Sequence, residues 1–242
     1  FLHFFKILFK YICTYKSNSI MKKNVLALVA FAALSLTACK KENTTVETTD
    51  AVETTTQTAD AVTYNAVAAD SKIDWVGGKV SGDQHTGTIT LKEGQVFVTN
   101  NAVTGGKFTI DMNSIVVTDI TDAEMKAGLE GHLKGATAEN ADHFFNVSKF
   151  PTAAFEITKV SEENGKQMVE GNLTIKEATH AIKFPATVTV TDADVTIASD
   201  EFEIDRTKWA VNYNSGSVVK DLAGDKVIND NIKLKLAVKA TK

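Results

Sequence analysis

Apolar and polar residues alternate along most of the chain from Tyr64 onward. The C-terminal run is the clearest case, with apolar side chains at Ile232, Leu234, Leu236 and Val238 and lysines between them. A period of two is typical of strands that bury one face. Similar runs precede it, with apolar members at Ile73, Trp75, Ile89, Leu91, Phe108, Ile110, Met112, Phe155, Ile157, Leu173, Ile175, Ile182, Phe184, Val195, Ile197, Phe202 and Ile204.

Turn residues such as Gly77-Gly78, Gly105-Gly106 and Asn164-Gly165 separate these runs, and their short spacing predicts antiparallel hairpins. Residues 122 to 134 are the exception, because Met125, Leu129 and Leu133 recur there every four residues. This spacing predicts one amphipathic helix. Thr121 is expected to cap its start, and the helix is expected to cover one end of the sheet.

The pattern predicts a mainly β fold of roughly eight strands over residues 64 to 242, which is a suitable length for one domain. Periodicity alone does not distinguish a closed barrel from a sandwich. An eight-stranded barrel is just wide enough to be filled by its own side chains or to hold one slender ligand. The function depends on which of these two cases occurs.

Residues 1 to 20 precede Met21, where translation is expected to begin, and are interpreted as upstream sequence. Two lysines follow Met21, and an apolar run then extends from Val25 to Leu36. This arrangement is typical of a secretory signal, and the run is too short to span a bilayer core of ~30 Å comfortably. Residues 21 to 38 are therefore predicted to be a signal peptide.

The signal ends in Leu36-Thr37-Ala38-Cys39, which has the form of a bacterial lipobox. Cys39 is therefore expected to carry a diacylglyceryl group and to become the mature N-terminus. Two or three acyl chains would then hold the protein on a membrane. The segment from 39 to 63 is rich in Thr and Glu and is expected to be a flexible linker spanning about 25 to 30 Å. We therefore expect a lipid-anchored protein of the bacterial cell envelope, at the outer membrane, in the periplasm or on the cell surface.

Charge and cysteine content narrow the range of partners. Five of the 26 basic residues and none of the 30 acidic ones fall within residues 1 to 38, so the mature chain has 21 basic residues and a net charge of −9. This balance argues against nucleic acid and against an electrostatic attraction to anionic lipid. Cys13 lies in the upstream segment and Cys39 is expected to be lipidated, so no disulfide is expected.

Three blocks stand out in the second half of the chain: GHLKGATAENADHFFNVSKFPTAAFEIT at 131–158, GNLTIKEATHAIKFPATV at 171–188 and FEIDRTKWAVNY at 202–213. Together they resemble the YceI-like family, over roughly Ala69 to Lys239. The resemblance implies a single antiparallel eight-stranded lipocalin-like barrel with a short α-helical cap. It also implies a periplasmic or membrane-anchored protein that binds a polyisoprenoid.

Taken singly, the large apolar residues are best interpreted as core. The resemblance instead implies that the inner face of the barrel surrounds an isoprenoid chain or a quinone-type tail. The residues expected to line that apolar cavity are Trp75, Phe108, Ile110, Phe144, Phe145, Phe155, Ile157, Phe184, Phe202 and Trp209.

Three polar residues are candidates for the mouth of the cavity. His132 and His143 fall in the His-Leu and Asp-His-Phe-Phe motifs, although histidines near helix ends more often bind loop carbonyls. Arg206 is the only arginine, so its position requires a planar donor group, either for a ligand head group or for a salt bridge or carbonyl clamp. Asp205 is adjacent on a strand and points to the other face, so another acid is expected to pair with Arg206.

Enzyme motifs are absent: the chain has no Gly-x-Ser-x-Gly elbow, no Gly-rich phosphate loop and no closely spaced histidine pair. No catalytic residue, metal or cofactor is therefore expected, and the favoured function is sequestration or transport of one long apolar molecule. Two alternatives remain open, a structural or adhesive lipoprotein with a solid barrel and an enzyme acting on a lipid. The oligomeric state is also open, with a dimer as one option.

Overall fold

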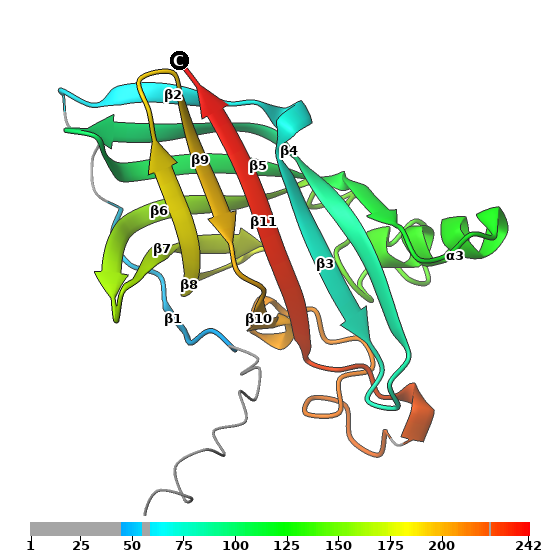
Figure 1. The fold of residues 1–242 in the computed structure, drawn as a ribbon. Coiled ribbons are helices and arrows are strands. Elements are labelled where there is room, and N and C mark those ends of the chain that lie inside the picture. The colour runs from blue at the N-terminus through cyan, green and yellow to red at the C-terminus, as the bar shows by residue number, and fades with distance from the viewer. Residues whose placement is uncertain (1–44, 55–58, 223) are drawn as a thin grey trace, which may run out of the picture. The chain divides into compact units, whose positions relative to one another are not determined.

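The structure is a computed structural model that describes residues 45–54, 59–222 and 224–242 (Figure 1). The predicted upstream segment, the signal peptide and Cys39 lie outside these residues. Within the described part, no helix has the length and apolar character needed to cross a membrane.

The domain contains one antiparallel sheet of eleven strands, and ten of them form the barrel wall (Figure 1). These are β2 (Val62–Ala66), β3 (Lys72–Gly78), β4 (Gln84–Thr99), β5 (Ala102–Val117), β6 (Thr152–Glu163), β7 (Lys166–Ile175), β8 (Ala178–Val190), β9 (Asp194–Ser199), β10 (Phe202–Asp205) and β11 (Asn231–Thr241).

The sheet closes on itself through β11. This strand pairs with β3 and β2 on one edge and with β9 and β10 on the other. Two places in the ring of strands are each filled by two successive strands. β2 and β3 fill one and are separated by the 3-10 turn η1 (Ala68–Asp70), and β9 and β10 fill the other and are separated by Asp200 and Glu201. Eight positions therefore form a ring, which confirms the predicted antiparallel barrel.

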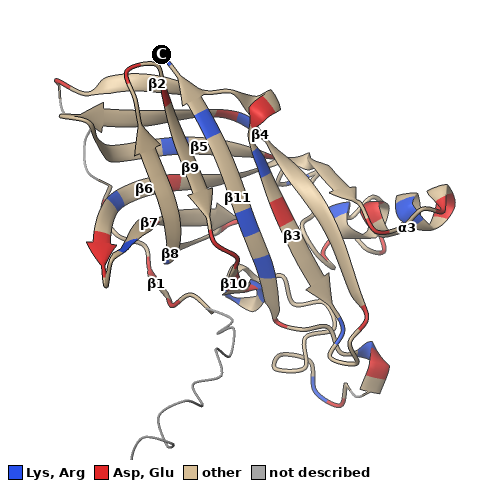
Figure 2. Ribbon diagram, in the orientation of Figure 1, with Lys and Arg blue, Asp and Glu red and all other residues tan. Residues whose placement is uncertain are grey.

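The period-two pattern places one face of each strand inside the barrel. In β5, for example, Phe108, Ile110 and Met112 are buried in the core, whereas the alternate residue Lys107 is exposed. Lysines recur along β11 between its apolar residues (Figure 2). Burial of alternate residues is the main apolar contribution to the stability of a closed sheet.

One helix, α3 (Ala123–Lys134), lies between β5 and β6 at one end of the barrel (Figure 1). The predicted Thr121 cap is wrong: the Asp122 side chain accepts hydrogen bonds from the amides of Glu124 and Met125. The carboxylate satisfies two amides that have no partner within the helix. Met125 was expected to face inward, but it is 66% exposed.

The expectation of a flexible linker from 39 to 63 does not hold for residues 45–54, which we call the strap. Strand β1 (Thr48–Asp50) pairs with β8 in the gap that β9 leaves unpaired, and Val46 is 5% exposed and packs in the core. Asn172 on β7 also bonds both the amide and the carbonyl of Val52. Buried apolar area and paired backbone groups offset the entropy of ordering this polar segment.

Candidate functional site

A cavity of about 570 Å³ opens at the end of the barrel that α3 covers. We call it the mouth cavity. Its walls come from β3, β4, β5, β11, α3 and the connections that follow α3 and β10. The lining residues are Trp75, Gly77, Gly78, Lys79, Asp83, Gln84, His85, Ile89, Ile115, Leu129, His132, Leu133, Phe144, Phe145, Arg206, Val211, Tyr213, Ile228, Ile232 and Leu234.

Most of this lining is aromatic or aliphatic. Helix α3 contributes Leu129 and Leu133, because a spacing of four residues places both on one helix face. The Trp75 indole lies against Gly87 on β4, where an added Cβ would come 2.4 Å from the ring. A side chain at that position would clash with the indole and, more closely still, with the backbone carbonyl of Val116 on β5. An apolar wall of this kind favours a ligand that is itself largely apolar.

A cluster of rings forms the polar part of the mouth. His132 Nε2 and His143 Nδ1 are 2.8 Å apart and share one hydrogen bond. Tyr213 stacks on His143 with ring centroids 4.1 Å apart, and it meets His132 edge-on at 4.9 Å. Burial lowers the pKa of His132 from its ordinary value, and the nearby His143 lowers it further. The neutral form of His132 is therefore favoured. Its hydrogen bond to His143 needs one ring to donate and the other to accept.

His85 lies on the opposite rim, on β4. Its Nδ1 is 2.9 Å from Asp119 Oδ2, and the amide of Thr86 donates to the other oxygen of the same carboxylate. Burial raises the pKa of Asp119, but these two hydrogen bonds, the backbone amide of Asp119 and the charge of His85 together lower the pKa from its ordinary value. The carboxylate thus fixes the orientation of a third imidazole at the mouth.

Arg206 is only 3% exposed, and its guanidinium is a carbonyl clamp. It donates to the carbonyl oxygens of Asn229, Val211 and Ile228. Burial lowers the pKa of the guanidinium, although Asp230 and Asp205 act in the opposite direction. Its nearest acid is Asp230, with an N–O distance of 3.6 Å, so the expected second acid is found.

Asp205 has a different partner, as the alternation of strand side chains predicts. Its carboxylate accepts from the amide and the hydroxyl of Thr207 and caps the 3-10 turn η2 (Arg206–Trp209). Arg206 therefore borders the cavity, but its donors are used to hold the 206–230 connection in place. The arrangement matches the clamp alternative better than the head-group alternative.

A second, smaller void of about 80 Å³ lies deeper in the barrel, and Leu234 lines both spaces. The void is surrounded by apolar side chains from every part of the wall. Phe184 stacks on Phe202 with centroids 4.5 Å apart and contacts Phe155 at 5.7 Å. These three rings fill much of the interior, so the barrel is open at the mouth and nearly close-packed below it.

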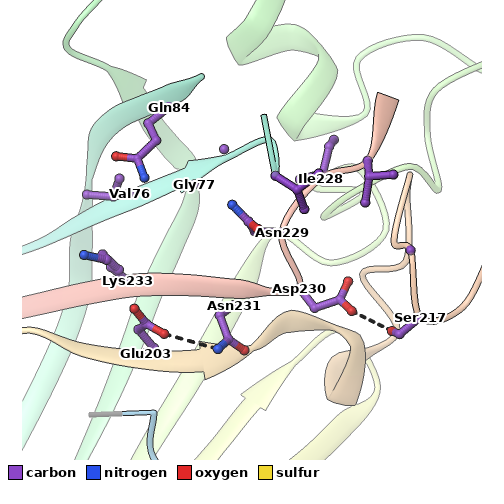
Figure 3. Close-up of a pocket in the computed structure, with 14 residues that line it drawn as sticks. Val76, Gly77, Gln84, Glu203, Ser217, Ile228, Asn229, Asp230, Asn231 and Lys233 are labelled. Atoms are coloured by element: carbon purple, nitrogen blue, oxygen red, sulfur yellow. Dashed lines mark hydrogen bonds between the residues drawn. The ribbon is translucent and has the colours of Figure 1, made fainter. Parts of the chain in front are cut away.

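A third pocket, of about 600 Å³, lies on the outer face of β3, β10 and β11 (Figure 3). Its lining is mixed, and its polar residues include Glu203, Asp230, Asn231 and Lys233. The Glu203 carboxylate accepts from the Asn231 amide, and Asp230 accepts from Ser217. Carboxylates and amides satisfied by neighbours do not favour an apolar ligand, so we place the candidate site at the mouth cavity.

The structure brings most of the predicted residues to these two inner spaces. Trp75, Phe144 and Phe145 line the mouth cavity together with His132 and Arg206, and His143 lies directly behind His132. The predicted residues that line the deep void are Phe108, Ile110, Phe155, Ile157, Phe184 and Phe202.

Trp209 lines neither space. It is 0% exposed, its indole N–H donates to the Leu173 carbonyl at 2.9 Å, and it meets His180 edge-on. It is a structural residue of the wall, because its only polar atom is already satisfied.

Several lining residues were not predicted as site residues. Tyr213 ends the FEIDRTKWAVNY block, so the motif itself contained the signal. Leu129 and Leu133 were predicted to lie on the apolar face of the helix. A helix that covers the end of the barrel turns this face toward the interior, so the signal for both residues was present. His85 had no such signal, because its hydrogen-bond partner Asp119 is 34 residues away in sequence. Within the described ranges, no three His, Cys, Asp or Glu side chains are grouped as a metal site requires.

Comparisons with known proteins agree with this geometry. The chain is similar to the crystal structure of Burkholderia cenocepacia BcnA, with 21% identity, a TM-score of 0.53 and coverage of 73% of this chain and 99% of BcnA. It is also similar to a polyisoprenoid binding domain from Saccharophagus degradans implicated in plant cell wall breakdown, with 14% identity, a TM-score of 0.50 and coverage of 74% and 97%.

At these identities the two structures establish a shared fold. No curated protein is similar enough in sequence to match the chain. The sequence profile of the YceI-like domain, however, matches residues 64–240, which is most of the chain and includes the barrel wall except for the first residues of β2 and the last residue of β11. The chain therefore belongs to the YceI-like domain family.

Proposed function

We propose that this protein binds one apolar molecule of the isoprenoid or quinone-tail type through the mouth cavity of its barrel. The observation that carries the proposal is an apolar-walled space of about 570 Å³ with a few polar groups at one rim. Volumes of about 300–1,000 Å³ with such linings are typical of small-molecule sites. The polyisoprenoid binding domain of Saccharophagus degradans, which has the same fold, supports this ligand class.

The deep void sets how such a ligand would lie. A space of about 80 Å³ cannot hold a long chain, so the ligand's widest part occupies the mouth cavity and its end points toward Leu234. A longer tail enters further only if Phe155, Phe184 and Phe202 rotate apart. Burial of the tail contributes roughly 25 cal/mol per Å² of apolar area, and the imidazoles at the rim orient the polar end.

Lipid anchoring and a place in the bacterial cell envelope belong to the same proposal. They rest on the lipobox at Cys39 and on the basic and apolar segments before it. A barrel held at a membrane surface by acyl chains is suited to take up a membrane lipid or to deliver one.

The proposal is tested by measuring whether the barrel contains a bound ligand. Purified protein is extracted with organic solvent for mass spectrometry, and isoprenoids are then added back while the melting temperature is measured. Leu129→Trp fills the mouth cavity from α3, whereas Ala127→Trp places the same ring on the exposed face of the helix.

We expect Leu129→Trp to weaken binding about tenfold or more, a loss of about 1.4 kcal/mol, and Ala127→Trp to have little effect. An empty barrel whose melting temperature does not respond to isoprenoids contradicts the proposal. That result favours a structural lipoprotein with a packed interior.

A lipid-modifying enzyme is the second candidate, because His132 and His143 lie within hydrogen-bond reach of each other at the cavity wall. Such a pair can relay a proton between a bound ligand and solvent. Turnover of a bound lipid that is lost in His132→Ala supports this candidate. An unchanged ligand mass after long incubation with wild-type protein contradicts it.

A further inference from the structure

The strap begins at the mouth end of the barrel. Thr45 forms a bridge with Glu203 on β10 and bonds its carboxylate, and the Asn231 amide at the start of β11 donates to the Thr45 hydroxyl. Asn231 and Glu203 line the outer pocket, which shares Gly77, Gly78 and Ile228 with the mouth cavity (Figure 3). The chain therefore enters the described domain beside the mouth.

This position limits how far the domain can lie from a lipid anchor. Cys39 and Thr45 are separated by six residue steps, which span about 20 Å at full extension. Strand β11 has 11 residues and runs from the mouth end to the opposite end. At ~3.3 Å per residue and a tilt of about 40°, it covers about 25 Å along the barrel axis. Thr45 lies level with Lys233 through its bridge to Glu203, so the opposite end of β11 is about 20 Å away along the axis. A lipidated Cys39 therefore reaches a bilayer at the mouth end easily, and it reaches the opposite end only at full extension.

The exposed apolar residues are also concentrated at the mouth end of the barrel. Seven large apolar side chains are exposed among the described residues. Five of them lie on elements that frame the mouth: Val80 in the β3–β4 turn, Val116 near the end of β5, Met125 on α3, and Val218 and Val219 in the connection before β11. Val62, at the far end, and Val52, on the strap, are the other two.

We propose that the mouth end of the barrel docks on the surface of a lipid bilayer, with Val80, Met125 and Val218 at the contact and the mouth cavity facing the acyl chains. The net negative charge gives no electrostatic attraction, so the acyl anchor and these apolar side chains hold the contact. The inference rests on the lipid anchor of the proposed function and is independent of what the barrel binds.

The experiment uses the full lipidated protein in vesicles of phosphatidylethanolamine and phosphatidylglycerol. Cys39 is expected to be acylated, so a new cysteine gives one site for an environment-sensitive fluorophore. Val80→Cys labels the mouth end, and Val62→Cys labels the far end at an exposed valine of similar accessibility, 44% against 56%. Doxyl-labelled lipid and aqueous iodide then serve as the two quenchers.

We expect doxyl lipid to remove about half of the emission at Val80→Cys, because interfacial apolar residues lie about 5–10 Å into the headgroup and acyl boundary. Val62→Cys is expected to respond to iodide alone. Equal quenching at both sites, stronger doxyl quenching at Val62→Cys, or an intact mass without acyl chains overturns the proposal. Barrel occupancy, measured by extraction from the same vesicles, reports separately on ligand binding.

Discussion

At the scale of single residues, Arg206 shows why this lysine-rich chain contains one arginine. Three backbone carbonyls, from Asn229, Val211 and Ile228, converge on one buried guanidinium. A planar group with five fixed donors satisfies them together, whereas a lysine ammonium is a compact charge on a flexible stem. The sequence indicated that the position was special, and the carbonyl clamp was one of its two stated alternatives.

Arg206→Lys is expected to lower the free energy of unfolding by about 2–4 kcal/mol, because one or two buried carbonyls lose a charged donor. Lys208→Ala, two residues away and exposed, is expected to change it by less than about 0.5 kcal/mol. Urea unfolding monitored by tryptophan fluorescence measures both values. Equal stability of Arg206→Lys and wild type would show that the clamp is dispensable.

His132 makes the stability of the domain depend on pH. The pKa of His132 is lowered in the folded state, so below the unfolded value of about 6.5 the unfolded chain binds more protons. Unfolding free energy should therefore fall as pH drops from about 6.5 toward the folded pKa, and His132→Gln should flatten this slope. Denaturant titrations between pH 7.5 and about 5 test this.

Asp119 gives the internal comparison for that experiment. Its pKa is also lowered from 3.8 in the folded state, so the stability it contributes is lost only as pH falls below this value. If the free energy of unfolding of His132→Gln still falls as the pH drops from 7.5 to about 5, the effect belongs to another group.

At the scale of elements, the sequence predicted the features that depend on local periodicity. The strands and helix α3 follow from periods of two and of about four residues, because each buries one face. The cap and the inward face of α3 were less predictable. Thr121 and Asp122 are both good capping residues, and the choice depends on where β5 ends. Met125 belongs to the apolar repeat but extends beyond the edge of the barrel and is exposed.

Asp122→Ala is expected to destabilise the domain by about 1 kcal/mol, because two amides at the start of α3 lose their acceptor. Thr121→Ala is the matched control and is expected to be near neutral. Since Leu129 and Leu133 line the mouth cavity, ligand dissociation should also be faster in Asp122→Ala. Thermal unfolding with and without ligand distinguishes the two variants, and equal effects of both would contradict the assigned cap.

At the scale of the whole molecule, closure and cavity shape could not be predicted from local pattern. β11 pairs with β3 about 160 residues earlier, and period two is the same in a barrel and in a sandwich. The resemblance to known proteins selected the barrel. Alternation identifies inward residues such as Phe184 and Phe202, but whether they enclose a void or stack on each other depends on rotamers across the barrel. The strap was missed because a Thr- and Glu-rich segment has no periodic signal.

The strap gives a prediction about the whole barrel wall, since it completes the gap between β8 and β10. Asn172 holds the backbone of Val52 through two hydrogen bonds, and Asn172→Ala should release the strap at a cost of about 1–2 kcal/mol. Amide hydrogen exchange at Thr48–Asp50 should then accelerate about 5- to 30-fold, while amides of β11 keep their protection. Thr174→Ala, two residues along the same strand, should leave strap exchange unchanged. Equal acceleration in the strap and in β11 would show instead that the segment unfolds only with the rest of the barrel.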